Sequence, residues 1–190
     1  AAFNCYRFSQ HMNADQKKIE LAMFMQSLFT ADDRIQLSME SAGFQEDTLF
    51  GLNLEDVPKD GHCFFHATRL GLQDLGINLE YYEIRRVLAE HIQANMHLYR
   101  NFIREDERGN FVRGVRGNDW GDHILVVAAA RAFQLNFVVL QAGGTDPYIV
   151  HEPSARETVY LAYDGAALHY QALRGQANED LVQQVQAARF

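Results

Sequence analysis

The sequence is poor in cysteine, with only Cys5 and Cys63 among its 190 residues. One lies near the N-terminus and the other within a motif, so no disulfide framework is expected and a reducing compartment is favoured. Long apolar runs are also missing, since none reaches the roughly 20 residues that a membrane-spanning helix needs. Lys and Arg number 17 against 25 Asp and Glu, and the net charge of −8 argues against nucleic acid or an anionic membrane as a partner.

The rest of the composition is that of a folded globular chain. Hydrophobic residues make up 47% of it and aromatic residues 12%, so we expect one monomeric domain with a sizeable core. No signal peptide follows Ala1, and the sequence is expected to be an excised domain whose targeting region lies elsewhere. The expected compartment is the cytoplasm, or the host cytoplasm if the source is a pathogen.

Hydrophobic periodicity predicts both helices and strands along the chain. Helices are expected over residues 15–29, 31–42, 79–103, 120–133 and 178–190, and a further helix begins at residue 63. Strands are expected over residues 49–57, 136–141, 158–163 and 168–173. The glycine-containing segments 70–77 and 104–119 are predicted to be a connection and a charged surface loop. Residues 1–47 are predicted to be a helical extension, which either caps the domain or binds a partner.

A short turn motif, Asp60-Gly61-His62-Cys63, lies between the first predicted strand and a helix. Pro58 ends the strand because proline has no N–H for a sheet ladder, and Gly61 can adopt a positive φ. Cys63 then falls in the first helical turn, where unpaired N–H groups and the helix dipole favour a thiolate. The N–H groups of the loop could also stabilise an oxyanion. Cys63 is therefore a candidate nucleophile; the alternative is a small buried hydrophobe.

The candidate general base is His169, one of eight histidines. It opens the last predicted strand directly after a hairpin turn, and a strand holds an imidazole more rigidly than a loop does. His66 lies one turn after Cys63 and points along the helix, while His123 is expected to cap a helix or lie at the surface. No Cys/His cluster has the spacing of metal ligands, so neither a metal nor a cofactor is expected.

Three blocks of the sequence, in this order, resemble those of the OTU (ovarian tumour) cysteine proteases. They are Asp60-Gly61-His62-Cys63, Trp120-Gly121-Asp122-His123 and Leu168-His169-Tyr170. The resemblance covers residues 49–173. It implies an α/β (α+β), papain-like fold with a central, mostly antiparallel sheet flanked by helices. The domain would span residues 48–175, with a variable arm at about 79–119 and a C-terminal helix within 176–190.

The resemblance also implies an activity: hydrolysis of isopeptide bonds after the C-terminal glycine of ubiquitin. Cys63 would be the nucleophile, His169 the base and Asp60 a further member of the catalytic set. Gly61 and His62 are oxyanion candidates. The expected partner is ubiquitin or a polyubiquitin chain. Residues expected to bind it are Trp120 and the arginines of the arm, Arg104, Arg108, Arg113 and Arg116.

One position departs from the family pattern. Many members carry Asp or Asn two residues after the histidine, whereas this sequence has Gln171. Because alternate residues of a strand share a face, Gln171 is expected to reach the imidazole of His169 as a neutral acceptor. Two other functions stay open: an inactive ubiquitin-binding module, and a cysteine protease or transferase with an unrelated substrate on the same fold.

Overall fold

The computed structural model describes residues 44, 47–119, 121, 123–142 and 147–188. The predicted helices over 15–29 and 31–42, and Trp120, lie outside these residues. The helices are α3 (Cys63–Asp74), α4 (Tyr81–Ala94), α5 (Met96–Tyr99), the 3-10 helix η2 (Glu105–Glu107), α6 (Arg108–Arg116), α7 (His123–Phe133) and α8 (Glu179–Ala187). The strands are β1 (Thr48–Leu49), β2 (Leu52–Glu55), β3 (Asn136–Gln141), β4 (Tyr148–Val150), β5 (Thr158–Asp164) and β6 (His169–Arg174).

The described strands form one six-stranded sheet in the order β1-β2-β6-β5-β3-β4. Every pairing is antiparallel except that of β3 with β5, which is parallel. The first long strand of the domain, β2, therefore lies beside the last, β6, with Glu55 opposite Ala172. This confirms the predicted mixed fold with a mostly antiparallel sheet, and it brings residues near 56 close to the start of β6.

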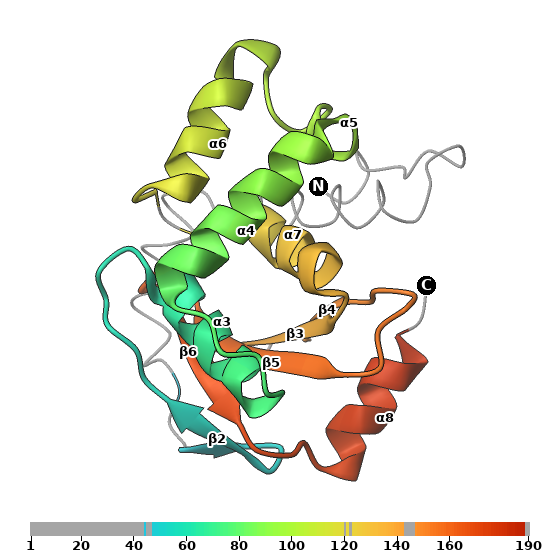
Figure 1. The fold of residues 1–190 in the computed structure, drawn as a ribbon. Helices are drawn as coiled ribbons and strands as arrows, with labels where there is room; N and C mark the ends of the chain where they lie inside the picture. The colour runs from blue at the N-terminus through green and yellow to red at the C-terminus, as the bar shows by residue number, and fades with distance from the viewer. Residues whose placement is uncertain (1–43, 45–46, 120, 122, 143–146, 189–190) are drawn as a thin grey trace, which may run out of the picture.

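Apolar side chains cover both faces of the sheet. Helices α3, α4 and α7 pack on one face in the larger cluster, while Leu181 and Val185 of α8 pack on the other, against Val138 and Leu173. Figure 1 shows α4 and α7 above the sheet, α6 beside α4, and α8 near the C-terminus on the other side. Within the described ranges, no helix combines the length and the apolar character needed to span a bilayer.

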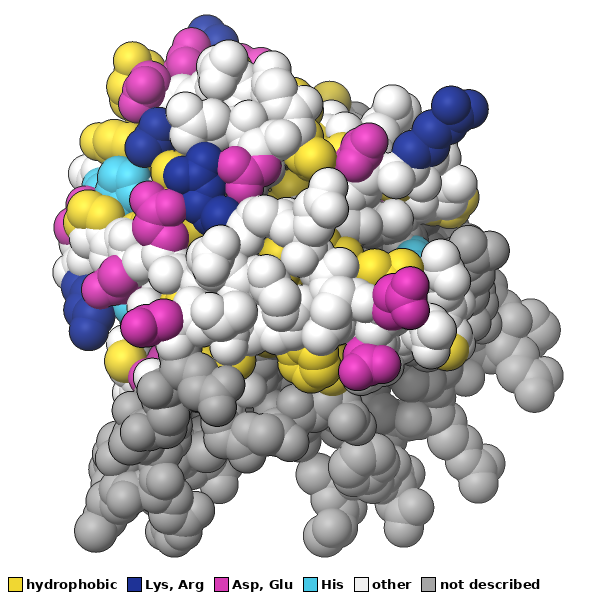
Figure 2. All heavy atoms as spheres, turned by 90° about the horizontal axis from the view of Figure 1, so that it is seen from below, with side chains coloured by type: hydrophobic (Ala, Val, Ile, Leu, Met, Phe, Trp, Pro, Cys, Tyr) yellow, Lys and Arg dark blue, Asp and Glu magenta, His cyan; other side chains and the backbone are white. Residues whose placement is uncertain are grey.

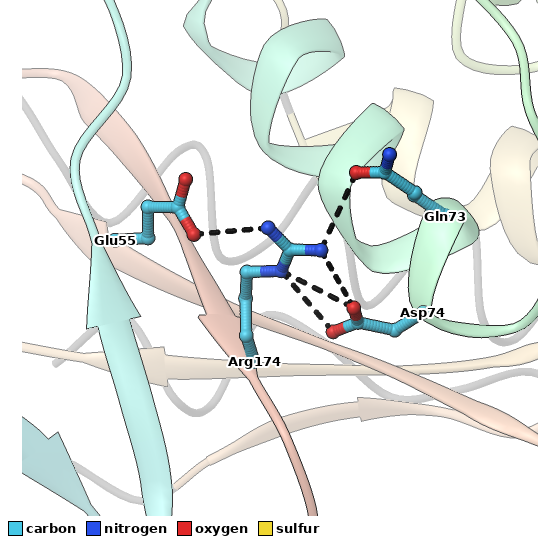
Figure 3. Close-up of polar contacts among 4 residues, drawn as sticks. All are labelled: Glu55, Gln73, Asp74 and Arg174. Carbon is cyan, nitrogen blue, oxygen red and sulfur yellow. Dashed lines mark hydrogen bonds and ion pairs between the residues drawn. The ribbon is translucent and has the colours of Figure 1, made fainter.

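A charged cluster fixes the helix of Cys63 to the sheet. Arg174 of β6 donates to Asp74 at the end of α3 (2.7 Å) and to Glu55 of β2 (3.1 Å), and also to Gln73 (Figure 3). These contacts join three elements at the end of α3 opposite Cys63.

On the face shown in Figure 2, acidic and basic side chains are interspersed, without one continuous patch of either sign among the coloured residues.

Four of the predicted elements differ from the structure. The single strand expected over 49–57 is instead the hairpin of β1 and β2, which ends at Glu55, because the chain turns at Phe50 and Gly51 with positive φ. The helix expected over 79–103 is interrupted at Asn95, so α4 and α5 are separate. Helix α3 continues through the expected connection to Asp74. The expected loop over 104–119 is mostly helix α6, because Val115 is buried and Phe111 and Val112 pack on the core. The charges and glycines of this segment suggested a loop, but tertiary packing of one apolar side stabilises a helix there.

Candidate active site

Cys63 is the first residue of α3, directly after a turn in which Gly61 has φ +83°. A φ in this range is favourable for glycine and strained for most other residues. The Cys63 side chain is only 2% exposed, and the backbone N–H of Tyr170 in β6 points at its sulfur. The predicted turn before a helix is therefore confirmed, and the candidate nucleophile, Cys63, lies beside the residue that follows His169.

The pKa of Cys63 differs from the sequence-based expectation. Burial raises the pKa of this thiol, and the N–H groups of Tyr170 and Phe64 lower it by less, so the net shift is upward. The expectation of a depressed pKa considered only the helix dipole, whereas desolvation of a thiolate at a 2% exposed site is the larger effect. At neutral pH the resting side chain is thus a thiol, which needs a base to remove its proton.

His169 begins β6 and is 3% exposed. Its Nε2 lies 2.7 Å from Oδ1 of Asp56, the residue that follows β2. A carboxylate can only accept, so Nε2 carries the proton and donates. The second ring nitrogen, Nδ1, is buried and has no hydrogen-bond partner among the described residues. A neutral imidazole with this tautomer presents a free lone pair at Nδ1, which is the form that a general base requires.

Asp56 is held in its ionised form. Burial raises the pKa of its carboxyl. The hydrogen bonds from His169 and from the Val57 N–H (2.9 Å) lower this pKa, and together they outweigh burial, so the net shift is downward. The structure therefore assigns the contact with the imidazole to Asp56 and not to Gln171. Gln171 is half-buried on β6 opposite Ala162 and makes no hydrogen bond to His169 within the described part of the chain.

The carboxylate of Asp60 binds within its own loop. It accepts from the His62 N–H (2.9 Å) and lies 3.1 Å from Nε2 of His66. Burial is the largest single effect and raises the pKa of Asp60, but the contacts with His62 and His66 together outweigh it and leave the pKa below its ordinary value. Asp60 therefore shapes the turn before Cys63 and does not contact His169 in the described structure.

His62 is neutral in this arrangement. Its Nδ1 accepts a hydrogen bond of 3.0 Å from Nε of the buried Arg85. Burial lowers the pKa of His62, and the nearby positive charge of Arg85 lowers it further. The side chain is thus turned into the protein, toward α4, so only the backbone of His62 belongs to the loop next to Cys63.

A layer of aromatic rings lies beneath β6. The sequence had suggested that His123 caps a helix or lies at the surface. The structure instead places it in the interior, where it is only 4% exposed. Its Nδ1 shares a hydrogen bond of 2.9 Å with the hydroxyl of Tyr170, and burial lowers its pKa to about 4. A Cβ at Gly121 would meet Phe64 of α3 at 2.6 Å, so the loop before α7 approaches the Cys63 helix as only glycine allows.

The four arginines that were expected to bind the substrate have different surroundings. Arg104 forms an exposed ion pair with Asp106, and Arg113 bonds the side chain of Asn110. Arg108 instead donates to the backbone carbonyls of residues 100 and 103, which fixes the end of α5. Arg116 is exposed at the end of α6.

Across the described residues, no group of His, Cys, Asp and Glu side chains could hold a metal ion.

Comparisons with known proteins agree with this geometry. A sequence profile of the OTU-like cysteine protease family matches residues 58–172. The chain is 27% identical over 128 residues to an ovarian tumor domain-containing deubiquitinating enzyme of Arabidopsis thaliana. The match covers 66% of this chain and 35% of that relative. The chain therefore spans about a third of the length of the relative.

Two solved structures share the fold. An OTU deubiquitinase from Wolbachia pipientis wMel superimposes with a TM-score of 0.58 at 16% identity, covering 73% of this chain and 99% of that one. The Hazara virus OTU bound to ubiquitin gives a TM-score of 0.52 at 18% identity, covering 67% and 83%. The profile match extends over more than half of the sequence, and the fold agrees with it. The chain therefore belongs to the family of OTU-like cysteine proteases.

Proposed function

We propose that this chain is a deubiquitinating cysteine protease, which hydrolyses the isopeptide bond after the C-terminal glycine of ubiquitin. The observation that carries the proposal is the state of His169. Its Nε2 is held by Asp56, its Nδ1 is unpartnered, and the next residue's N–H points at the sulfur of Cys63. A nucleophile, a base and an acceptor that orients the base are the three groups that covalent acyl transfer needs.

In the proposed mechanism the Cys63 thiol gives its proton to Nδ1 of His169 as the sulfur attacks the glycine carbonyl. Asp56 stabilises the imidazolium that forms. His169 then protonates the leaving lysine amine as the C–N bond breaks, which leaves a thioester. A water molecule, deprotonated by His169, attacks this thioester and restores the free thiol. Because burial raises the pKa of the Cys63 thiol, His169 is needed to take its proton so that the sulfur can act as a nucleophile.

The oxyanion would be stabilised by the loop before α3. The His62 N–H already donates to Asp60, so the N–H groups of Gly61 and Cys63 on either side of it are the proposed donors. Asp60 contributes by fixing the peptide between them. Its proposed role is therefore to position the loop, and the orientation of the base belongs to Asp56.

The comparisons support ubiquitin as the substrate. The curated relative is a deubiquitinating enzyme, and three of the structural neighbours were solved with ubiquitin bound. The acidic chain, with its net charge of −8, suits the basic residues that precede the two terminal glycines of ubiquitin. The retention of both Cys63 and His169 favours an enzyme over an inactive binding module.

Ubiquitin that carries an electrophile at its C-terminus tests this proposal. The chain is expected to form a covalent adduct heavier by one ubiquitin, with the modification mapped to Cys63 by mass spectrometry. Binding without adduct formation would instead indicate the inactive binding module. Neither binding nor an adduct would indicate a different substrate on the same fold.

The arm is proposed to contribute to substrate binding and not to the chemical step. Arg104→Glu, Arg113→Glu and Arg116→Glu are each expected to raise KM about two- to fivefold with kcat unchanged, the effect of a lost exposed charge contact. Arg156→Glu, which makes the same charge change in the loop before β5, is the control. Steady-state kinetics on di-ubiquitin measure both constants. Unchanged KM in all three variants would place the substrate surface elsewhere.

A further inference from the structure

Arg85 lies in the middle of α4 and is only 1% exposed, which is unusual for a residue that always carries a charge. Its guanidinium carbon stacks 3.9 Å from the ring centroid of Phe65, in the first turn of α3. Its hydrogen bonds go to uncharged acceptors, four backbone carbonyls and one imidazole. A buried charge is costly, so a guanidinium in this position needs its donors satisfied together.

These acceptors come from three separate segments of the chain. In the loop before Cys63, Arg85 donates from Nε to the His62 ring (3.0 Å) and from Nη2 to the Gly61 carbonyl (3.3 Å). At the end of α6 in the arm, Nη1 donates to the Val115 carbonyl (2.9 Å). Ahead of Gly121, Nη2 donates to the Asp119 carbonyl (2.8 Å). In Figure 1, α4 runs between α6 and the sheet.

The contact with Gly61 has a direct consequence for the loop. In a trans peptide the C=O and the N–H point in opposite directions. The Gly61 carbonyl points to Arg85, so the His62 N–H points away from it, and there it donates to Asp60. The peptide between Gly61 and His62 is thus held from both sides. Its orientation in turn determines where the N–H groups of Gly61 and Cys63 point.

We propose that Arg85 is a positioning residue for the chemical step: it holds the loop before Cys63 in the orientation that binds the oxyanion. This inference rests on the proposed function for its kinetic consequence, although the geometry it describes is independent of substrate. Because the same guanidinium also binds the end of α6 and Asp119, the loop is fixed relative to the arm. A substrate that binds the arm therefore meets an oxyanion site already aligned with it.

Two variants of Arg85 test the proposal. Arg85→Gln removes the charge, and Arg85→Lys keeps it but cannot satisfy a forked set of acceptors. Both are expected to lower kcat on di-ubiquitin about 10²-fold, comparable with the loss of one oxyanion donor, with KM changed less than about twofold. Arg86→Gln, at the exposed neighbouring position on α4, is the matched control and is expected to retain the parent kcat.

A second pair of variants leaves the buried Arg85 in place and changes its acceptor at position 62. His62→Asn places an amide oxygen near the position of Nδ1, so it can still accept from Arg85, while His62→Leu cannot. His62→Leu is expected to lose about 10-fold or more in kcat, comparable with misplacing a catalytic group, and His62→Asn to recover most of that loss. Equal kcat in these two variants would overturn the proposal even if the Arg85 variants did not fold.

A readout without substrate separates this inference from the proposed function. The groups that face His62 are Arg85 from α4, Asp60 and His66 from its own loop and helix, and the ring of Tyr81. Arg85→Gln is expected to raise the pKa of His62, measured by NMR titration, because the nearby positive charge and its hydrogen bond are lost.

The outcomes of these experiments are distinct. If the parent protein forms no adduct with electrophilic ubiquitin, the proposed function fails, while the NMR titration and the amide shifts of Gly61 and Cys63 still test the positioning role. If the parent reacts but folded Arg85→Gln has the parent kcat, the inference about Arg85 fails and the proposed function stands. An unchanged pKa of His62 in that variant would also overturn the inference.

Discussion

Replacing Cys63 by alanine is expected to abolish isopeptide cleavage while leaving the protein folded and able to bind ubiquitin. The sulfur is the only atom removed, and the site is buried against Tyr170, so the change in packing is small. Without a nucleophile no thioester forms, and the loss in kcat is expected to reach about 10⁶-fold, as for the nucleophile of other covalent proteases. Cleavage of di-ubiquitin followed on gels measures it, and calorimetry measures the binding that remains.

The second cysteine of the chain supplies the control for this experiment. Cys5→Ala makes the same chemical change at a position outside the protease profile, and it is expected to cleave at the parent rate. Cleavage at the parent rate by Cys63→Ala would remove the central claim of a thioester mechanism. Loss of activity in both variants would point to a general effect of thiol removal on folding, which circular dichroism would reveal.

The second large effect is expected at Asp56. Asp56→Ala removes the acceptor of the His169 Nε2–H, so the imidazole can rotate or change tautomer, and the charge that stabilises the imidazolium is lost. In serine proteases the loss of the carboxylate that orients the histidine costs about 10⁴-fold in kcat. A loss of about 10²- to 10⁴-fold in kcat/KM is expected here. The dependence is stronger than for a thiolate–imidazolium pair, because burial keeps the resting Cys63 as a thiol.

Two companion variants make this prediction specific. Asp56→Asn retains a side-chain oxygen that can accept from Nε2, so it is expected to keep more activity than Asp56→Ala. Gln171→Ala is expected to stay near the parent rate, since the hydrogen bond to the imidazole of His169 comes from Asp56, and none joins Gln171 to it among the described residues. If Gln171→Ala were as inactive as His169→Ala, while Asp56→Ala cleaved normally, the assignment of the orienting residue would be reversed.

The parts of the site that are local in sequence could be predicted. The turn before Cys63 depends on neighbouring residues, a proline and a glycine with positive φ, and the structure confirms it. His169 was identified for a similar reason, because a hairpin turn precedes it directly. Asp56 could not be found in this way: it lies 113 residues from His169, and only the pairing of β2 with β6 brings them together. The available signal was a carboxylate at the end of a predicted strand.

The remaining errors have the same physical origin. His123 follows a polar stretch at a helix start, which suggested the surface, but its ring lies among Tyr148, Tyr163 and Tyr170 from three different strands. The segment over 104–119 has the composition of a loop, and its helix is stabilised by packing on the core. Arg85 was not singled out from the sequence, because its acceptors lie 23 to 34 residues away from it along the chain. Contacts between distant segments decided each of these cases.

Under the proposed mechanism, the pairing of β2 with β6 also sets the stage of synthesis at which Cys63 can react. Pairings between strands so far apart in sequence form late and slowly in folding, because the entropy of closing the intervening loop must be overcome first. During synthesis the helix that begins with Cys63 emerges long before β6 does. Asp56 precedes Cys63 in the chain, but until β6 is made and docks beside β2 the proposed base, His169, lies beside neither of them. An incomplete chain on the ribosome therefore carries an unactivated thiol, and protease activity is expected to arise only with the completed sheet.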